Sequence, residues 1–116
     1  MATVQISFTD ASNNEDSFEV FRSANGGTST GAAGEKLATI TWNNGTTNWD
    51  YTQEAVDTNG SSDGALTTSV TSPPTTVGQQ FILRYTEGNA GTYKYAVLAK
   101  NNIGPSALVQ STPITV

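Results

Sequence analysis

The chain has 116 residues with no cysteine and no histidine, and its formal net charge is −5 at pH 7. This length suits one domain, and the missing residue types exclude disulfides, thiolate nucleophiles, Ser-His-Asp triads and the usual zinc and haem sites. An acidic surface repels phosphate backbones, so we expect no nucleic-acid partner.

Apolar residues that alternate with polar ones predict a series of short strands. In chain order, the predicted strands cover 4–8, 17–23, 37–42, 46–52, 65–71, 80–86, 92–100 and one or two segments within 106–116. Turn residues separate them, including an Asn-Gly hairpin signal at 44–45 and a loop over 57–64. No segment combines a helical period with caps, so the pattern predicts an all-β antiparallel sandwich.

The apolar residues that share one face of these strands are the predicted core. They include Trp42, which shares a strand face with Ile40. The full predicted set is Val4, Ile6, Phe8, Phe18, Val20, Leu37, Ile40, Trp42, Phe81, Leu83, Tyr93, Tyr95, Val97 and Ala99.

Residues 89–95, with the sequence NAGTYKY, resemble the tyrosine corner of immunoglobulin-like sandwiches. In that motif a tyrosine hydroxyl near the start of strand F bonds back to the upstream backbone, and the resemblance assigns this structural role to Tyr93. Tyr95 stands where true immunoglobulin domains carry their second cysteine, which implies a sandwich without the inter-sheet disulfide. Residues 96–106 are similar to the F strand and F–G turn of fibronectin type III domains.

The beginning of the chain adds to this resemblance. Residues 6–10 and 18–23 resemble strands B and C of bacterial and viral fibronectin type III domains. The resemblance implies a single immunoglobulin-like, fibronectin type III-like β-sandwich over residues 1–116. The middle of the chain departs from the family pattern, and we interpret approximately 24–79 as an enlarged central insertion.

One loop has the composition of a weak calcium site. Asp57, Asn59 and Asp63 place oxygen atoms at alternate positions around a Gly turn, and hard cations bind such oxygens. The same residues also form ordinary turns. We expect no other cofactor and no catalytic residue, because the ten acidic residues lie mostly in predicted turns and no scaffold pairs them.

Three aromatic residues are candidates for recognition. Trp49 and Tyr51 could stack on sugar rings, with Trp42 more buried than either. Phe21 lies on the nominally outer face of its strand, so Phe21 and Trp49 are also candidates for a protein interface. The alternative is that these rings fill the core or cover the inserted hairpin.

The leading functional hypothesis is a non-enzymatic virion structural protein. The first residues show no basic or apolar leader pattern, and no apolar run is long enough to span a membrane. These features and the Thr-, Asn- and Gly-rich composition favour a bacteriophage capsid decoration protein. We expect it to be made in the host cytoplasm and to bind the major capsid protein at the virion surface, with weak glycan binding as a further role. The alternative is an extracellular carbohydrate-binding or spacer module of a secreted enzyme or adhesin.

Overall fold

The computed structural model describes residues 3–10, 15–54, 60–62, 72–101 and 103–116, which form strands with antiparallel pairing. A short 3-10 turn, η1 (Ala33–Glu35), precedes β3. The strands are β1 (Thr3–Thr9), β2 (Ser17–Arg22), β3 (Lys36–Asn43), β4 (Asn48–Gln53), β5 (Gly60–Ser62), β6 (Gln80–Glu87), β7 (Thr92–Tyr93), β8 (Tyr95–Lys100), β9 (Val109–Gln110) and β10 (Ile114–Thr115).

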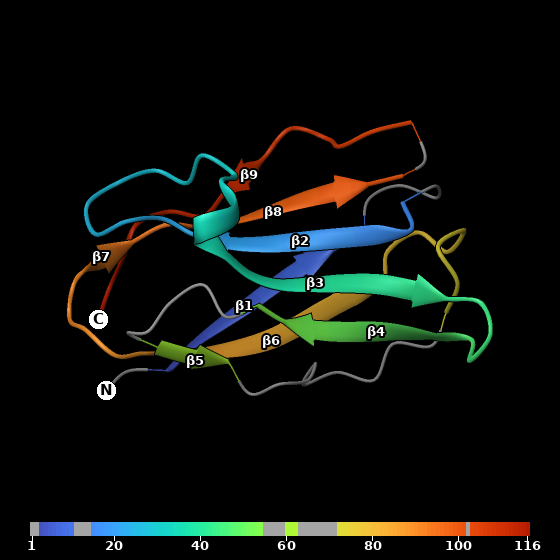
Figure 1. Ribbon diagram of the computed structural model, residues 1–116, viewed down its shortest axis with the longest axis horizontal. Helices are drawn as coiled ribbons and strands as arrows, with labels where there is room; N and C mark the ends of the chain where they lie inside the picture. Colours follow the sequence, from blue (N-terminus) through green and yellow to red (C-terminus); the bar gives the residue numbers. More distant parts are fainter. Residues whose placement is uncertain (1–2, 11–14, 55–59, 63–71, 102) are drawn as a thin grey trace.

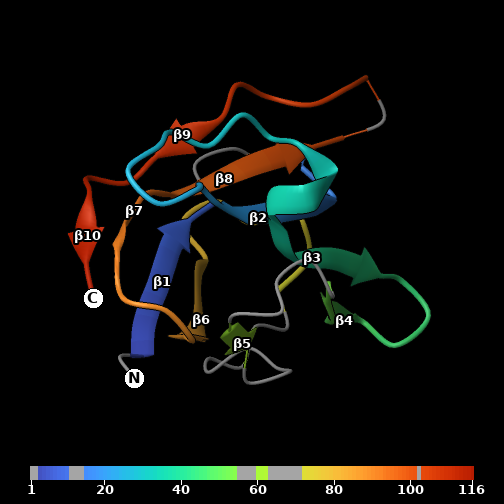
Figure 2. The ribbon, with the colours of Figure 1, turned by 60° about the vertical axis from the view of Figure 1, so that its left-hand side comes forward.

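Two larger sheets form the body of the fold. One has the strand order β1-β6-β5 and the other has the order β4-β3-β2-β8-β9, while β10 and β7 make a separate pair. Figure 1 shows β1 and β6 passing behind β2 and β3, and Figure 2 shows the same two layers turned by 60°. The all-β, sandwich-like character predicted from the sequence is therefore confirmed for the described residues.

One cluster of buried side chains lies between the two layers. Its members come from both sheets, so the sheets bury their inner faces against each other. The alternation that predicted this core is confirmed for most positions, although Phe8, Trp42, Val97 and Ala99 are only partly buried and pack against the cluster. The buried members are Val4, Ile6, Phe18, Val20, Leu37, Ala38, Ile40, Trp49, Phe81, Leu83, Tyr85, Tyr93 and Tyr95.

Aromatic rings form one end of this core. The ring of Phe18 lies 5.1 Å from that of Phe81 and 5.7 Å from that of Trp49, measured between centroids. Phe8 stacks on Phe81 at 5.2 Å, and Trp42 meets Trp49 edge-on at 5.5 Å. Such tilted and offset pairs are the favoured arrangements of aromatic rings, so this group ties β1, β2 and β6 to the β3–β4 hairpin.

The β3–β4 hairpin closes through an asparagine side chain. Asn43 Oδ1 accepts hydrogen bonds from the amide nitrogens of Gly45 (2.9 Å) and Thr46 (3.3 Å), and Thr47 has a positive φ of 51°. These residues complete a four-residue turn between the paired Asn43 and Asn48. The returning strand therefore begins at Asn48 and not at residue 46, because Thr46 and Thr47 belong to the turn.

Two further predicted elements differ from the structure. The predicted loop over 57–64 contains a short strand, β5, because residues 60–62 pair with the edge of β6. The predicted strand over 92–100 is interrupted at Lys94, because Tyr93 pairs with Ile114 of β10 whereas Tyr95 begins β8 beside β2. The strand predicted over 65–71 lies outside the described residues.

The segment 23–35 folds back over the end of β2, and Figure 1 shows η1 in front of that strand. Gln110 fixes it from β9: its Nε2 donates to the carbonyl of Ser29 (2.8 Å) and its Oε1 accepts from the Ser29 amide (3.3 Å). Glu35 Oε1 accepts hydrogen bonds from the Thr30 amide (2.8 Å) and from the hydroxyls of Thr30 and Ser29. Long-range and local hydrogen bonds thus order a Gly-rich segment.

We predict that Trp49→Ala destabilises the protein more than Trp42→Ala does. Trp49 is 4% exposed and packs on Phe18 and Phe81, so its removal leaves a cavity, whereas Trp42 is only partly buried. Truncation of a buried tryptophan lowers the free energy of unfolding by about 3–5 kcal/mol. Urea denaturation of both variants measures the difference, and equal or reversed effects would contradict the placement of Trp49.

We also predict that Glu35 makes stability depend on pH at the acidic end. Burial acts to raise the pKa of Glu35, but the hydrogen bonds from Thr30 and Ser29 outweigh it and hold the pKa below its ordinary value of 4.5. A carboxyl with a lowered folded-state pKa stabilises the fold above its unfolded pKa, and the contribution disappears as pH falls through the folded pKa. The stability advantage of wild type over Glu35→Gln, measured by urea denaturation, should be constant well above pH 4.5 and shrink as the pH falls below 4.5. A difference that stays the same from neutral to acidic pH would contradict this assignment.

Candidate functional site

A groove opens between the two sheets along β1. It has a volume of about 550 Å³ and runs between β1 on one side and the segment that carries β9 and β10 on the other. The apolar side chains that line it come from both layers, and Val109 on its rim is 71% exposed. The residues along it are Val4, Gln5, Ile6, Ser7, Phe8, Thr9, Asp10, Glu15, Phe18, Tyr95, Val97, Ala99, Ser106, Val109, Gln110, Ser111 and Ile114.

The backbone of β1 faces this groove with an unused edge. β1 is the end strand of its sheet, and among the described residues it pairs only with β6. Asp10 donates its amide to the Gln79 carbonyl (2.8 Å) and accepts from the Gly78 amide (2.7 Å). Because amide and carbonyl directions alternate along an antiparallel strand, Phe8 and the other even-numbered residues bond towards β6. The backbone amides and carbonyls of the odd-numbered residues therefore point to the open edge. These residues are Thr3, Gln5, Ser7 and Thr9.

The end of the groove next to residue 10 is acidic. Asp10 is 1% exposed and Glu15 also lines the groove. The Oε2 atom of Glu15 is buried, and no described residue donates a hydrogen bond to it. No lysine or arginine is among the residues that line the groove. This end therefore carries negative charge in a partly enclosed, mostly apolar setting, where a cation would be bound favourably.

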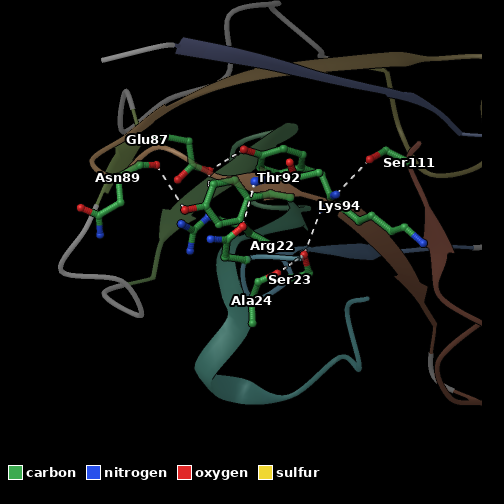
Figure 3. A network of polar contacts seen from close by, with 11 residues as sticks. Arg22, Ser23, Ala24, Glu87, Asn89, Thr92, Lys94 and Ser111 are labelled. Carbon is green, nitrogen blue, oxygen red and sulfur yellow. Dashed lines mark hydrogen bonds and ion pairs between the residues drawn. The ribbon is translucent and has the colours of Figure 1, made fainter. Parts of the chain in front are cut away.

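A buried polar cluster lies beside the groove, and Figure 3 shows it around Arg22 and Glu87. Glu87 is 1% exposed, and its Oε1 accepts hydrogen bonds from Arg22 Nε at 2.8 Å and from the Tyr95 hydroxyl. The Arg22 guanidinium lies 3.8 Å from the centre of the Tyr93 ring, a cation–π contact. Since Arg22 and Tyr95 belong to one sheet and Glu87 to the other, the cluster joins the two layers.

Tyr95 keeps its hydroxyl proton, which the hydrogen bond to Glu87 requires. Burial, and then the hydrogen bond to Glu87, raise the pKa of the Tyr95 hydroxyl far above its ordinary value of 10. The hydroxyl therefore stays a donor wherever the protein is folded. Arg22 Nε and the Tyr95 hydroxyl both donate to Glu87 Oε1 across the two sheets, so this cluster has a structural role. The groove is the better candidate for binding.

The aromatic residues that the sequence offered for recognition are not exposed. Phe21 is fully buried, because a β-bulge follows Val20 and the segment 23–35 folds over this end of β2. Trp49 is 4% exposed, and its Nε1 donates to the Ser72 carbonyl at 2.9 Å. Tyr51 is partly buried and packs against the core. The expected exposure of Phe21 and Trp49 is wrong, and neither forms a docking surface or a sugar platform in this fold.

Tyr93 makes the hydrogen bond that the sequence resemblance implies. The Tyr93 hydroxyl donates to the carbonyl of Asn89 at 3.2 Å, four residues upstream. The Asn25 side chain braces the same turn, since its Oδ1 accepts the Thr92 amide at 2.9 Å. A Cβ at Gly91 would lie 2.8 Å from Asn25 Oδ1 and 2.9 Å from the Tyr93 hydroxyl. A side chain at this position would therefore displace the Asn25 and Tyr93 groups that brace the turn.

The calcium candidates Asp57, Asn59 and Asp63 lie outside the described residues, so the weak prediction of a calcium site stays a prediction. Within the part of the chain that the structure describes, no three acidic side chains gather in a way that could hold a metal ion. That same part contains no helix with the length and apolarity to cross a membrane.

Sequence reasoning named the apolar residues of the groove but assigned them to the closed core. Val97 and Ala99 were predicted to be core, and both are partly buried along the groove. The sequence pattern carried no signal for the groove, because the shortness of β9 and β10, two residues each, is visible only in the structure. The acidic end was missed because Asp10 and Glu15 lie in a predicted turn.

Comparisons with known proteins assign the chain to no family. No protein-family model matches the chain, no curated protein is significantly similar to it, and no solved structure matches its fold significantly. The functional conclusion therefore depends on the geometry of this chain.

We predict that removal of either partner of Glu87 strongly destabilises the protein. Arg22→Met leaves the Glu87 carboxylate buried without its cation, and breaking a buried ion pair in this way costs about 3–5 kcal/mol. Tyr95→Phe removes one hydrogen bond to a charged group, which costs about 1.5–3 kcal/mol. Urea denaturation measures both effects. The control Arg84→Met changes an exposed arginine and should alter stability by no more than about 0.5 kcal/mol. Equal effects at Arg22 and Arg84 would contradict the structural role of the cluster.

Proposed function

We propose that the fold is an immunoglobulin-like sandwich and that the chain forms one domain. In this assignment β5, β6 and β1 correspond to strands D, E and B, and β4, β3, β2, β8 and β9 correspond to C″, C′, C, F and G. The strand orders of the two sheets and the Tyr93 hydrogen bond support it. The fibronectin type III subclass is supported by the sequence segments alone. Since β3, β4 and β5 fall within 24–79, the enlarged insertion corresponds to strands C′, C″ and D.

This assignment gives the groove a place in the fold. In an immunoglobulin-like domain, strand A lies beside strand B. Here β1 takes the position of strand B, and among the described residues no strand lies on its outer edge. The groove occupies the space beside β1 where a further strand would contribute apolar side chains, and no described residue pairs with this edge.

We propose that the protein is a non-enzymatic binding protein that docks on another protein. The observation that carries this proposal is the groove with its open backbone edge, because it offers apolar surface and hydrogen-bonding groups together. Exposed apolar surface of this kind is typical of interaction sites, and an unused strand edge adds main-chain hydrogen bonds to the affinity.

For the biological setting, we propose a bacteriophage virion structural protein, specifically a decoration protein on the outer capsid. The partner is then the major capsid protein. The acidic, cysteine-free, Thr- and Asn-rich composition supports this setting. Many copies bound to the assembled shell, and not to free subunits, would stabilise the shell by mass action.

A carbohydrate-binding or spacer module has less support. The sequence-based case depended on Trp49 and Tyr51 as a stacking platform, and Trp49 lies in the core. A sugar ring needs an accessible aromatic face. Trp42 keeps partial exposure, but its Nε1 donates to Asn44 at 3.0 Å within the hairpin turn. The structure therefore provides no open pair of aromatic rings among these candidates.

We predict that the intact 116-residue chain is present in purified phage particles from its source at a copy number comparable to that of the major capsid protein. Quantitative mass spectrometry of the particles measures this ratio, with a known tail protein as the internal low-copy standard. A ratio close to that of the tail protein would contradict capsid decoration and indicate a tail or vertex position. Absence from the particles would contradict the virion setting altogether.

A further inference from the structure

We propose that the groove binds one extended segment of the partner protein as an added strand beside β1, with a basic residue at its amino-terminal end. The segment has apolar residues at alternate positions after the basic residue. This inference rests on the proposed function as a protein-binding module, because it states the chemistry by which the partner is held.

The first argument is the backbone of β1. Thr3, Gln5, Ser7 and Thr9 direct their amides and carbonyls to the open edge, as the bonds of Asp10 to β6 require. An extended chain alongside satisfies these groups with a ladder of hydrogen bonds. β1 is seven residues long, so an added strand of similar length uses the whole edge.

The second argument is the alternation of side chains over the groove. Val4, Ile6 and Phe8 face inward, and across the groove Val97 and Ala99 of the other sheet complete an apolar floor. Residues directly opposite each other in paired strands lie on the same face. Every second side chain of the added strand therefore enters the groove opposite an inward residue of β1, and these side chains have to be apolar.

The third argument is charge. Asp10 continues the inward alternation of β1 and is buried, and the Glu15 carboxylate lies at the same end of the groove. A strand that runs antiparallel to β1 has its amino-terminal end opposite Asp10. A lysine or arginine in the position opposite Asp10 lies at the end of the groove that Glu15 lines, where Glu15 Oε2 accepts no hydrogen bond from a described residue. Charge-assisted hydrogen bonds to such a carboxylate are the stronger ones.

These three arguments define a sequence pattern for the partner segment. Read from its amino-terminal end, the pattern is a basic residue opposite Asp10 and then apolar residues opposite Phe8, Ile6 and Val4, each separated by one outward-facing residue. The peptide KTVTVTV fits this pattern. The same composition in reverse, VTVTVTK, places the lysine beside Thr3 and Val4, where the groove is not acidic.

The first test compares these two peptides, each acetylated and amidated at its ends and labelled at its carboxyl end. Fluorescence anisotropy measures their binding to the full chain. We expect KTVTVTV to bind about tenfold more tightly than VTVTVTK, because in antiparallel pairing with β1 only the first places its lysine at the end of the groove that Glu15 lines. Equal affinities, or no binding of KTVTVTV at millimolar protein, would overturn the proposal.

The second test changes the protein. Ser7→Pro removes an amide on the open edge, while Ser7→Ala keeps it, so only the proline variant should weaken KTVTVTV binding, by about tenfold. Thermal melts check that each variant folds. If the proline variant does not fold, Ala99→Leu tests the same site by filling the groove from the other sheet. Unchanged binding in a folded variant of either kind would overturn the proposal.

The third test reverses the charge. Glu15→Lys should lose the preference for KTVTVTV over the glutamate peptide ETVTVTV, since lysine at position 15 repels the basic residue. Glu54→Lys is the matched control, because Glu54 follows β4 and its Oε1 accepts the Thr39 hydroxyl (3.1 Å) on the opposite side of the sheet. The control variant should keep the lysine preference. Loss of preference in both variants would indicate an effect of net charge alone and overturn the proposal.

Two outcomes separate this inference from neighbouring ones. A dimer in light scattering that is lost in Ser7→Pro would mean that a second copy closes the edge, and it would overturn the proposal of a partner segment. The peptide tests need no phage particle, so their result is independent of the virion setting. Capsid attachment without peptide binding would support the proposed function and overturn this inference. Peptide binding without capsid attachment would support this inference and overturn the virion setting.

Discussion

The carboxylate of Glu87 is the interaction on which the two layers most depend. The chain has no cysteine, so no disulfide joins the sheets, and Glu87 of β6 instead receives Arg22 of β2 and Tyr95 of β8. Buried charges are tolerated only when they are paired and hydrogen-bonded, so the contact fixes the separation of the sheets at this end. Tyr95 also lines the groove. The same contact therefore keeps one wall of the groove in position while its rim stays open.

The alternation of apolar residues predicted most of the core, because period two determines which side chains share a face. Trp49 shows where that reasoning was incomplete. Any hairpin with an even number of turn residues pairs even-numbered positions of β3 with odd-numbered positions of β4, as the pairs Trp42–Trp49 and Ile40–Tyr51 show. Paired residues lie on the same face, so Trp49 had to join Trp42 on the core side. That inference was available from the sequence.

The burial of Phe21 and the existence of the groove were not predictable in the same way. The cover over Phe21 is a Gly-rich segment that is held by Gln110, which lies 81 positions from Ser29 along the chain. No local pattern reports such a contact. The groove depends on which strand ends a sheet and on how short β9 and β10 are, and strand order is a property of the whole topology. Sequence patterns therefore predicted the strands and their inner faces but not the open edge.

The open edge of β1 has a consequence for the behaviour of the protein in solution. An unpaired strand edge is a template for pairing with other chains, and natural sheets limit this hazard with charged residues that point inward. Asp10, buried at the end of β1, is such a residue. Repulsion between molecules of net charge −5 adds to its effect. The repulsion between molecules fades near the isoelectric pH of about 4.3, where the net charge approaches zero. Acidic buffers are thus the conditions that promote edge-to-edge aggregation of this chain.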